Sequence, residues 1–197
     1  MTDTGRAHDI ARSLLEDSLP RRWAHVQGVA ETARTLAPIL GRNADLLTAA
    51  AILHDIGYAP TLVGTGFHPL DGARYLRDIE HAEPMICRLV AHHSCAIIEA
   101  EERGLARQLA REFKPAPRDL ADALIYCDMT TGPDGQRMAI DQRLADIRAR
   151  YGPTDLVTRA IARSAPELEA ATGRIARKLR THTAAPRPVA VAAGVAF

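Results

Sequence analysis

The segment Ala49–Leu53 is an unbroken apolar run, and it ends on two ionisable residues, His54 and Asp55. Gly57 follows shortly afterwards, as the kind of residue that commonly ends a helix. The same two residue types recur along the chain, at His25, His68, His92, His93 and Asp128. Imidazole nitrogen and carboxylate oxygen together suit iron, manganese or zinc. The pattern therefore indicates a helical core built around a metal site.

The composition indicates an ordinary globular chain. At 197 residues it most simply forms one domain, and 47% of its residues are apolar. Aromatic residues make up only 4%, so Leu, Ile, Val and Ala must build the core. The formal net charge is +1, and both signs are mixed along the chain. No large single-sign field therefore calls for a nucleic-acid polymer or a membrane as partner.

The three cysteines, Cys87, Cys95 and Cys127, are scattered, and no C-x-x-C pair occurs. Their odd number argues against a disulfide framework, and the missing pair argues against a thiolate zinc site. The N-terminus carries no signal-peptide pattern, and the apolar runs fall short of the roughly 18–20 residues needed to span a bilayer. We therefore expect a cytoplasmic protein, and leave a homodimer open as its assembly.

Apolar residues recur with helical spacing almost throughout, and no strand pattern or internal repeat is present. We predict an all-α fold: a single helical bundle over residues 1–182, with its core at 20–131, and a disordered tail at 183–197, where Ala, Pro and Val follow no period. The expected helices cover residues 6–18, 20–37, 44–56, 68–81, a segment from 84 to the paired histidines, one or two pieces of 97–113 broken near Gly104, 118–130, 138–151, and 154–181 with an interruption near Ser164–Pro166.

His54 and Asp55 are adjacent, so in a regular helix their side chains would diverge by about 100°. They can serve one site only where the helix ends and its backbone departs from ideal geometry. His25 and Asp128 lie on two other predicted helices, so one ion could be held by these four residues. Each also has an ordinary explanation alone: a hydrogen-bonded core histidine for His25, a helix C-terminal charge for His54. Asp128 is harder to explain, because burying an unpaired carboxylate is costly.

A second ion could be held by His68, at a helix start, and by His92 or His93, late in another helix. Asp55 would then be the natural bridge, because a carboxylate can offer one oxygen to each metal. Helical geometry disfavours both neighbouring histidines reaching one ion, and we favour His92. His68 could equally be a simple lead-in to its helix, and His92-His93 could lie at the surface.

The order of these residues resembles the hallmark of the HD-domain metal-dependent phosphohydrolases, in which a histidine, an adjacent His-Asp pair and a distant Asp lie on a helical bundle. Here those are His25, His54-Asp55 and Asp128, and Ile52–Gly57 is similar to the family's core segment. Members with two metals carry two further histidines, and His68 and His92 fall where these are expected. The resemblance covers residues 20–131.

The resemblance implies hydrolysis of a phosphate ester or phosphoanhydride, often in a nucleotide or similar small phosphorylated substrate, by metal-activated water. It implies one or two divalent transition ions, iron or manganese first and zinc, nickel, cobalt or magnesium as alternatives, with Asp55 and His54 as catalytic residues. Cationic side chains would bind the remaining phosphate charge. Arg21 and Arg22, one turn before His25, and Arg137 are the candidates, although each could be a solvated surface charge.

Other functions fit the same pattern. The chain is similar to hydrolases that split diadenosine tetraphosphate, but it departs from them at His92–Ser94 and at Met129–Gly132. The cyclic-dinucleotide phosphodiesterases carry a Gly-Tyr-Pro triplet that is absent here. Di-iron oxygenases that cleave C–C or C–P bonds use the same scaffold and a matching ligand set. A non-catalytic metal-binding sensor is the third alternative, although the motif here is intact.

Overall fold

The computed structural model describes residues 3–184, and every regular element in this range is helical apart from an isolated bridge between Thr131 and Arg137. The predicted all-α class is therefore confirmed. The α-helices are α1 (Thr4–Leu15), α2 (Pro20–Thr35), α3 (Ala37–Leu40), α4 (Ala44–Leu53), α5 (His68–Asp78), α6 (Pro84–His92), α7 (Ala96–Glu102), α8 (Ala106–Glu112), α9 (Arg118–Met129), α10 (Ile140–Tyr151) and α11 (Leu156–Ala184). Short 3-10 turns are η1 (Gly41–Asn43), η2 (Ile56–Tyr58), η3 (Pro60–Leu62) and η4 (His93–Cys95).

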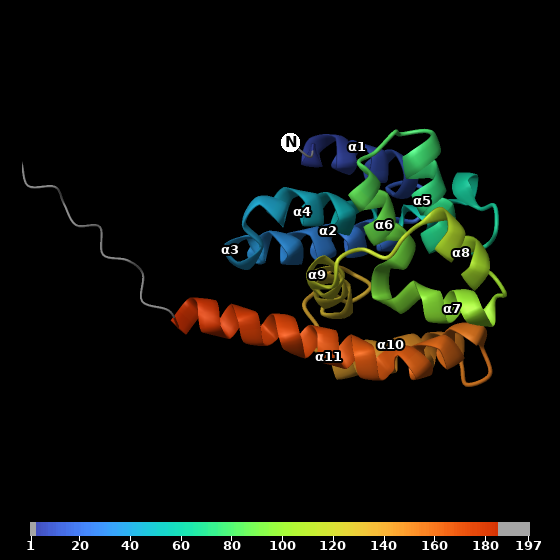
Figure 1. Ribbon diagram of the computed structural model, residues 1–197. Coiled ribbons are helices and arrows are strands. Elements are labelled where there is room, and N and C mark those ends of the chain that lie inside the picture. The colour runs from blue at the N-terminus through green and yellow to red at the C-terminus, as the bar shows by residue number, and fades with distance from the viewer. Residues whose placement is uncertain (1–2, 185–197) are drawn as a thin grey trace, which may run out of the picture.

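Helix α4 is the centre of the core. Every residue from Leu46 to Leu53 is buried, because α4 packs against α1, α2, α6 and α9. Figure 1 shows α2 and α4 side by side, with α10 and α11 forming a separate layer along one edge of the molecule. The C-terminal end of α4 lies inside the protein, and the two polar residues that follow it, His54 and Asp55, are buried as well.

Helix α9 joins the core to this outer layer. Its Leu124 belongs to the main hydrophobic cluster, whereas Ile125 and Met129 pack in a second cluster with residues of α10 and α11. The predicted interruption near Ser164–Pro166 is wrong, because α11 runs on through Pro166. The flanking Ala165 and Leu168 are both buried in the second cluster. Their packing offsets the hydrogen bond that an interior proline removes.

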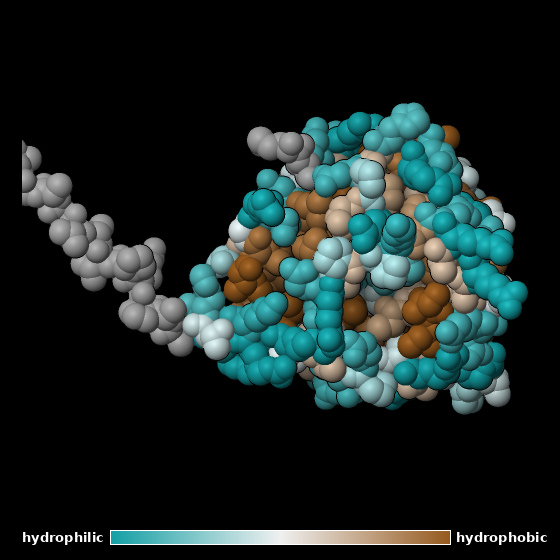
Figure 2. Space-filling model, in the orientation of Figure 1, coloured by the Kyte–Doolittle hydropathy of each residue, from teal (hydrophilic) through white to brown (hydrophobic). Residues whose placement is uncertain are grey.

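The surface of the face in Figure 2 is mostly hydrophilic, with hydrophobic residues visible in a few smaller patches. Of the predicted disordered tail, Thr183 and Ala184 belong to α11, and residues 185–197 lie outside the described range. In the described part of the chain, no single helix is long and apolar enough to cross a membrane. The bent pair Pro20–Thr35 and Ala37–Tyr58, inclined by 58°, meets that requirement only when both parts are taken together.

Two glycines allow the close backbone contacts that position parts of the site. A Cβ added to Gly57 would lie 2.0 Å from the carbonyl oxygen of His68, so η2 and the start of α5 touch through this glycine. A Cβ on Gly28 would lie 2.2 Å from the carbonyl oxygen of Gly135, in the turn that follows Asp128. Any other residue would push these segments apart.

A Gly57→Ala substitution should therefore destabilise the protein by about 1–3 kcal/mol, because the added methyl group has no room and α5 must move. The matched control is Gly173→Ala in α11, where the added Cβ meets only the flexible Arg177 side chain at 3.4 Å. That helical substitution should be neutral or stabilising by up to about 1 kcal/mol. Urea unfolding of both variants measures the difference, and equal stabilities would contradict the proposed contact.

Candidate metal centre

Six side chains from five segments converge beside the end of α4. His25 comes from α2, His54 and Asp55 follow α4, His68 begins α5, His93 follows α6, and Asp128 lies in the last turn of α9. Their ligand atoms form three overlapping groups, each within 4.8 Å: His25, His54 and Asp55; His54, His93 and Asp128; and Asp55, His68 and His93. The convergence predicted from the sequence is present for these six residues.

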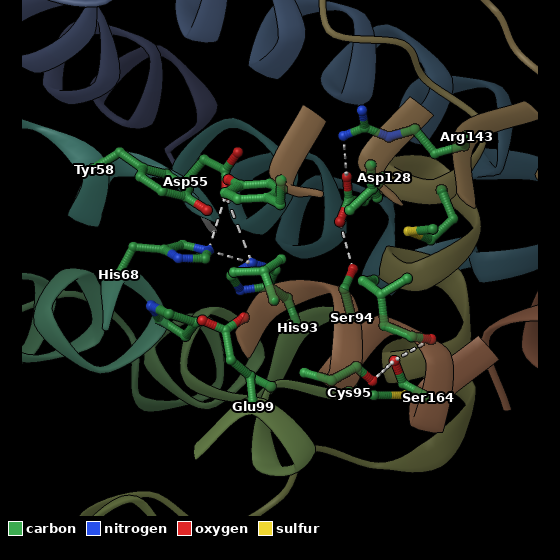
Figure 3. A pocket seen from close by; sticks show the side chains of 18 of the residues that line it. Asp55, Tyr58, His68, His93, Ser94, Cys95, Glu99, Asp128, Arg143 and Ser164 are labelled. Atoms are coloured by element: carbon green, nitrogen blue, oxygen red, sulfur yellow. Dashed lines mark hydrogen bonds and ion pairs between the residues drawn. The ribbon is translucent and has the colours of Figure 1, made fainter. Parts of the chain in front are cut away.

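Asp55 lies between two pairs of imidazoles. Its Oδ2 is 3.4 Å from His54 Nε2 and 3.9 Å from His25 Nε2. Its Oδ1 is 3.3 Å from His68 Nε2 and 3.6 Å from His93 Nε2. Figure 3 shows Asp55, His68 and His93 facing one another across the cavity. One carboxylate therefore offers an oxygen to each pair, which is the arrangement that a bridging ligand requires.

Asp128 lies beside the first of these pairs, His25 and His54. Its Oδ1 is 3.1 Å from His25 Nε2 and 3.9 Å from His54 Nε2. Its Oδ2 accepts a hydrogen bond from Ser94 Oγ, and the guanidinium of Arg143 approaches Oδ1 to 3.8 Å. Figure 3 shows Asp128 between Ser94 and Arg143. The carboxylate is thus held from two sides while one oxygen faces the imidazoles.

Three of the histidines are held by the backbone in the same way. Nδ1 of His25 lies 2.9 Å from the carbonyl oxygen of Gly132, Nδ1 of His54 lies 2.8 Å from that of Ala51, and Nδ1 of His93 lies 2.7 Å from that of Val90. A carbonyl oxygen only accepts, so Nδ1 must carry the proton in each ring. The Nε2 lone pairs then face the cluster. Metal-ligating histidines are oriented by such contacts.

His54 provides the test of whether a cation fits this site. The residue is fully buried, and among the described residues its Nε2 has no hydrogen-bond partner. Leaving a buried polar atom unsatisfied costs about 1–3 kcal/mol. A divalent ion among the three groups would satisfy Nε2, and the donor set of imidazole nitrogen and carboxylate oxygen suits transition metals. The residues therefore fit such an ion.

The protonation states agree with this fit. Burial alone would raise the pKa of Asp55, but His54 and Arg22 beside it hold the pKa well below its usual range. The pKa of Asp128 is likewise lowered, because its histidine neighbours outweigh the effect of burial. Burial lowers the pKa of His68, and burial with nearby histidines lowers that of His93 to about 4. Ionised carboxylates and neutral imidazoles are the forms that bind metals.

His54 is the exception. Burial would lower its pKa, but the adjacent Asp55 carboxylate outweighs burial and raises it. A cation at the cluster would reverse this balance, because it repels the proton on the imidazole.

The favoured His92 does not lie in the cluster, and its neighbour His93 does. His92, the last residue of α6, donates from Nε2 to the carbonyl oxygen of Phe113 at 2.8 Å. The backbone leaves the helix at His93, with φ −59° and ψ 151°. Ser94 and Cys95 then both have positive φ, 47° and 61°. This sparsely populated conformation turns the chain so that His93 and Ser94, rather than His92, face the cluster.

The comparisons with known proteins agree with this arrangement. The family model of the HD domain matches residues 22–146. This chain belongs to the HD-domain family. Ribonuclease Y from Rubrobacter xylanophilus is 34% identical over 70 residues, which cover 36% of this chain and only 14% of that relative. No solved structure matches the chain.

Membership places this HD domain in a superfamily of metal-dependent phosphohydrolases, which is consistent with its cluster of imidazoles and carboxylates. The match ends at residue 146, inside α10, so the end of α10 and all of α11 lie beyond it.

Of the three predicted arginines, the HD domain places only one at the cluster. Arg22 donates from Nη1 to Asp55 Oδ2 at 2.6 Å. Arg21 instead forms an exposed ion pair with Asp134, and Arg137 donates to Thr32 Oγ1 at 2.7 Å and lines no part of the cavity at the cluster. Arg21 and Arg137 are thus turned away by their own partners.

The cluster of the HD domain forms one wall of a cavity, and α7, α10 and α11 supply the others. Arg22 stacks on Tyr58, with its guanidinium carbon 4.1 Å from the ring centroid. Tyr58 in turn stacks on His68 at 3.8 Å between centroids. Sequence reasoning missed Tyr58, Ser94 and Arg143, because only the folded backbone brings them to the histidines.

The loop before α5 fixes His68 in place. The buried carboxylate of Asp71 accepts hydrogen bonds from the backbone amides of Gly64, Thr65 and Gly66 at 3.0–3.1 Å. The Thr65 hydroxyl also donates to it at 2.9 Å. Four donors on one carboxylate hold this loop rigidly, so the first residue of α5 enters the site in a defined position.

Proposed function

We propose that this HD domain is a metal-dependent phosphohydrolase that acts on a small phosphorylated molecule such as a nucleotide, in the cytoplasm. The observation that supports the proposal most strongly is the convergence of three backbone-held imidazoles and two ionised carboxylates on one point. Family membership supports the reaction class, and the arginines beside the cluster support an anionic substrate. The cofactor we propose is iron or manganese, as one or two ions.

The ligands to one ion would be His25, His54, Asp55 and Asp128, and His68 and His93 would hold a second ion through Asp55. When bound, such ions lower the pKa of water and compensate the charge of phosphoryl oxygens. The lowered pKa of Asp55 makes it a poor general base, so its role is to hold and orient. Arg22 fixes this orientation through its hydrogen bond to Oδ2 and presents cationic charge to the substrate.

The test is a metal analysis of protein purified without added ions, followed by a phosphate-release screen over nucleotides and sugar phosphates with manganese under anaerobic conditions. We expect one or two bound ions for each chain and phosphate release from at least one class of substrate. Protein that retains no metal and releases no phosphate would contradict the proposal. Dioxygen consumption by the iron-loaded protein, on a polyol or a phosphonate, would favour the oxygenase alternative instead.

A second candidate is cleavage of RNA, which the match to Ribonuclease Y favours. The same screen should therefore contain a short oligoribonucleotide. The cavity at the cluster has a volume of only about 90 Å³ and is covered by α10 and α11, which favours a small substrate. Cleavage of the oligoribonucleotide without turnover of any small phosphate compound would reverse this choice.

A further inference from the structure

Three arginines separate the cavity at the metal centre from a neighbouring one. Arg22 on α2, with Arg143 and Arg150 on α10, lines both cavities. The second cavity has a volume of about 280 Å³ and lies against Ser18–Arg22 and Pro133. Ligand sites commonly measure roughly 300–1,000 Å³, far more than the 90 Å³ at the metal centre. A ligand of ordinary size would therefore extend beyond the cavity at the metal centre, and these arginines border the neighbouring space.

Arg143 is the most buried arginine of this group, and one of its N–H donors has no acceptor in the described part of the chain. Its side chain is only 5% exposed, yet Nε has no hydrogen-bond partner among the described residues. Nη1 lies 3.3 Å from Asp146 Oδ2, and Nη2 stays 3.8 Å from Asp128 Oδ1, beyond hydrogen-bond distance. Burying a guanidinium with donors unused is costly unless another acceptor completes them.

The other two arginines, Arg22 and Arg150, also have more N–H donors than they use in hydrogen bonds to carboxylates. A guanidinium carries five N–H donors in a planar fork that matches the oxygens of a phosphate. Arg22 uses one donor on Asp55, and Arg150 uses one on Asp146. Three cationic groups therefore line both cavities, and their nearby carboxylate partners are Asp55, Asp128 and Asp146. Arg150 pairs with none of the six cluster residues among the described contacts, and it also lines the neighbouring cavity.

We propose that Arg143 and Arg150, together with Arg22, form a subsite for a second phosphate, so that the substrate is a phosphoanhydride rather than a phosphate monoester. The inference rests on the proposed function, because it places the scissile phosphate at the metal centre. Hydrolysis then forms one P–O bond from water and breaks the bridging P–O bond. The electron pair stays on the second phosphate as leaving group, and the proton of the water passes to it or to solvent.

The test uses Arg150→Gln, because Arg150 is exposed and its removal leaves the core intact. Arg148→Gln is the matched control: Arg148 is an exposed arginine on the same helix and lines neither cavity. Calorimetry on the full-length, manganese-loaded protein compares methylenediphosphonate with methylphosphonate, two probes that lack a hydrolysable anhydride. The control, measured alongside, corrects for manganese chelation by the diphosphonate.

We expect Arg150→Gln to weaken diphosphonate binding about 10-fold, the effect of one hydrogen bond to a charged group, and to change methylphosphonate binding less than about 3-fold. Arg148→Gln should change neither. Equal loss for both probes, or the same loss in the control, would overturn the subsite. In parallel, kcat/KM of the parent protein should be higher for nucleoside diphosphates than for nucleoside monophosphates. The kcat/KM for diphosphates should fall in Arg150→Gln and stay unchanged in Arg148→Gln.

The two proposals fail in different ways. Diphosphonate binding that depends on Arg150, in a protein that hydrolyses no phosphate compound, would support the subsite and contradict the hydrolase. Efficient hydrolysis of monoesters that is unaffected by Arg150→Gln would support the hydrolase and overturn the subsite.

Discussion

An Asp55→Ala variant is expected to lose both its bound metal and its hydrolytic activity while keeping its helical fold. Asp55 is the one carboxylate with an oxygen within 4.0 Å of His25, His54, His68 and His93 among the described residues, so its removal takes a ligand from both proposed ions at once. Loss of residues that merely orient ligands costs 10–100-fold in affinity, so loss of a bridging ligand should cost more than about 100-fold.

The metal content of Asp55→Ala, measured by elemental analysis, should fall to background, and circular dichroism should report unchanged helix content. Added manganese should raise the melting temperature of the parent protein and leave that of the variant unchanged, because only a binding-competent native state is stabilised by a ligand. Asp45→Ala is the matched control, since Asp45 is an exposed carboxylate in the first turn of α4, the helix that Asp55 follows. Full metal content and activity in Asp55→Ala would contradict the proposed centre.

The removal of Asp55 also leaves Arg22 without its carboxylate partner in the described structure. Breaking a buried pair by removing one member can cost about 3–5 kcal/mol, but Arg22 is 21% exposed and can turn toward solvent. The variant should therefore lose less stability than that range. A metal-free parent sample compared with the variant separates this effect from the loss of the metal.

The helices could be predicted because local chemistry determines where they begin and end. Pro20 and Pro84 each begin a helix as predicted, at the position where a proline costs no hydrogen bond. The convergence of His25 and Asp128 on the end of α4 could be predicted as well, because buried ionisable residues on several helices need one another. These features depend on periodicity and on polar groups inside apolar faces.

The remaining features depend on the tertiary structure. Arg143 and Arg150 lie among several arginines on α10, and nothing in the local pattern separates them from Arg148. Only the packing of Leu144 and Ile147 against α9 and α11 turns Arg143 toward the cluster. Its contribution to the site could not be predicted without the fold.

The assignment of His93 rather than His92 can be tested by a pair of alanine variants. His93→Ala should lose metal by a factor of 10 or more, because His93 belongs to two of the three ligand groups and His92 to none among the described residues. His92→Ala should keep its metal and lose about 1–2 kcal/mol of stability, since the carbonyl group of Phe113 loses its donor.

The two neighbours differ because the backbone changes conformation between them. In a continuous helix, the His93 side chain would point about 100° around the helix axis from that of His92. The sequence alone does not determine which of the two side chains faces the cluster. The extended ψ of His93 ends the helix, the positive φ values of Ser94 and Cys95 follow, and His93 Nε2 lies 3.1 Å from His68 Nε2. Elemental analysis and urea unfolding should therefore distinguish the two variants. His93→Ala should lose metal, and His92→Ala should be destabilised without losing metal. Metal loss in His92→Ala alone would show that this turn is arranged differently in the metal-loaded protein.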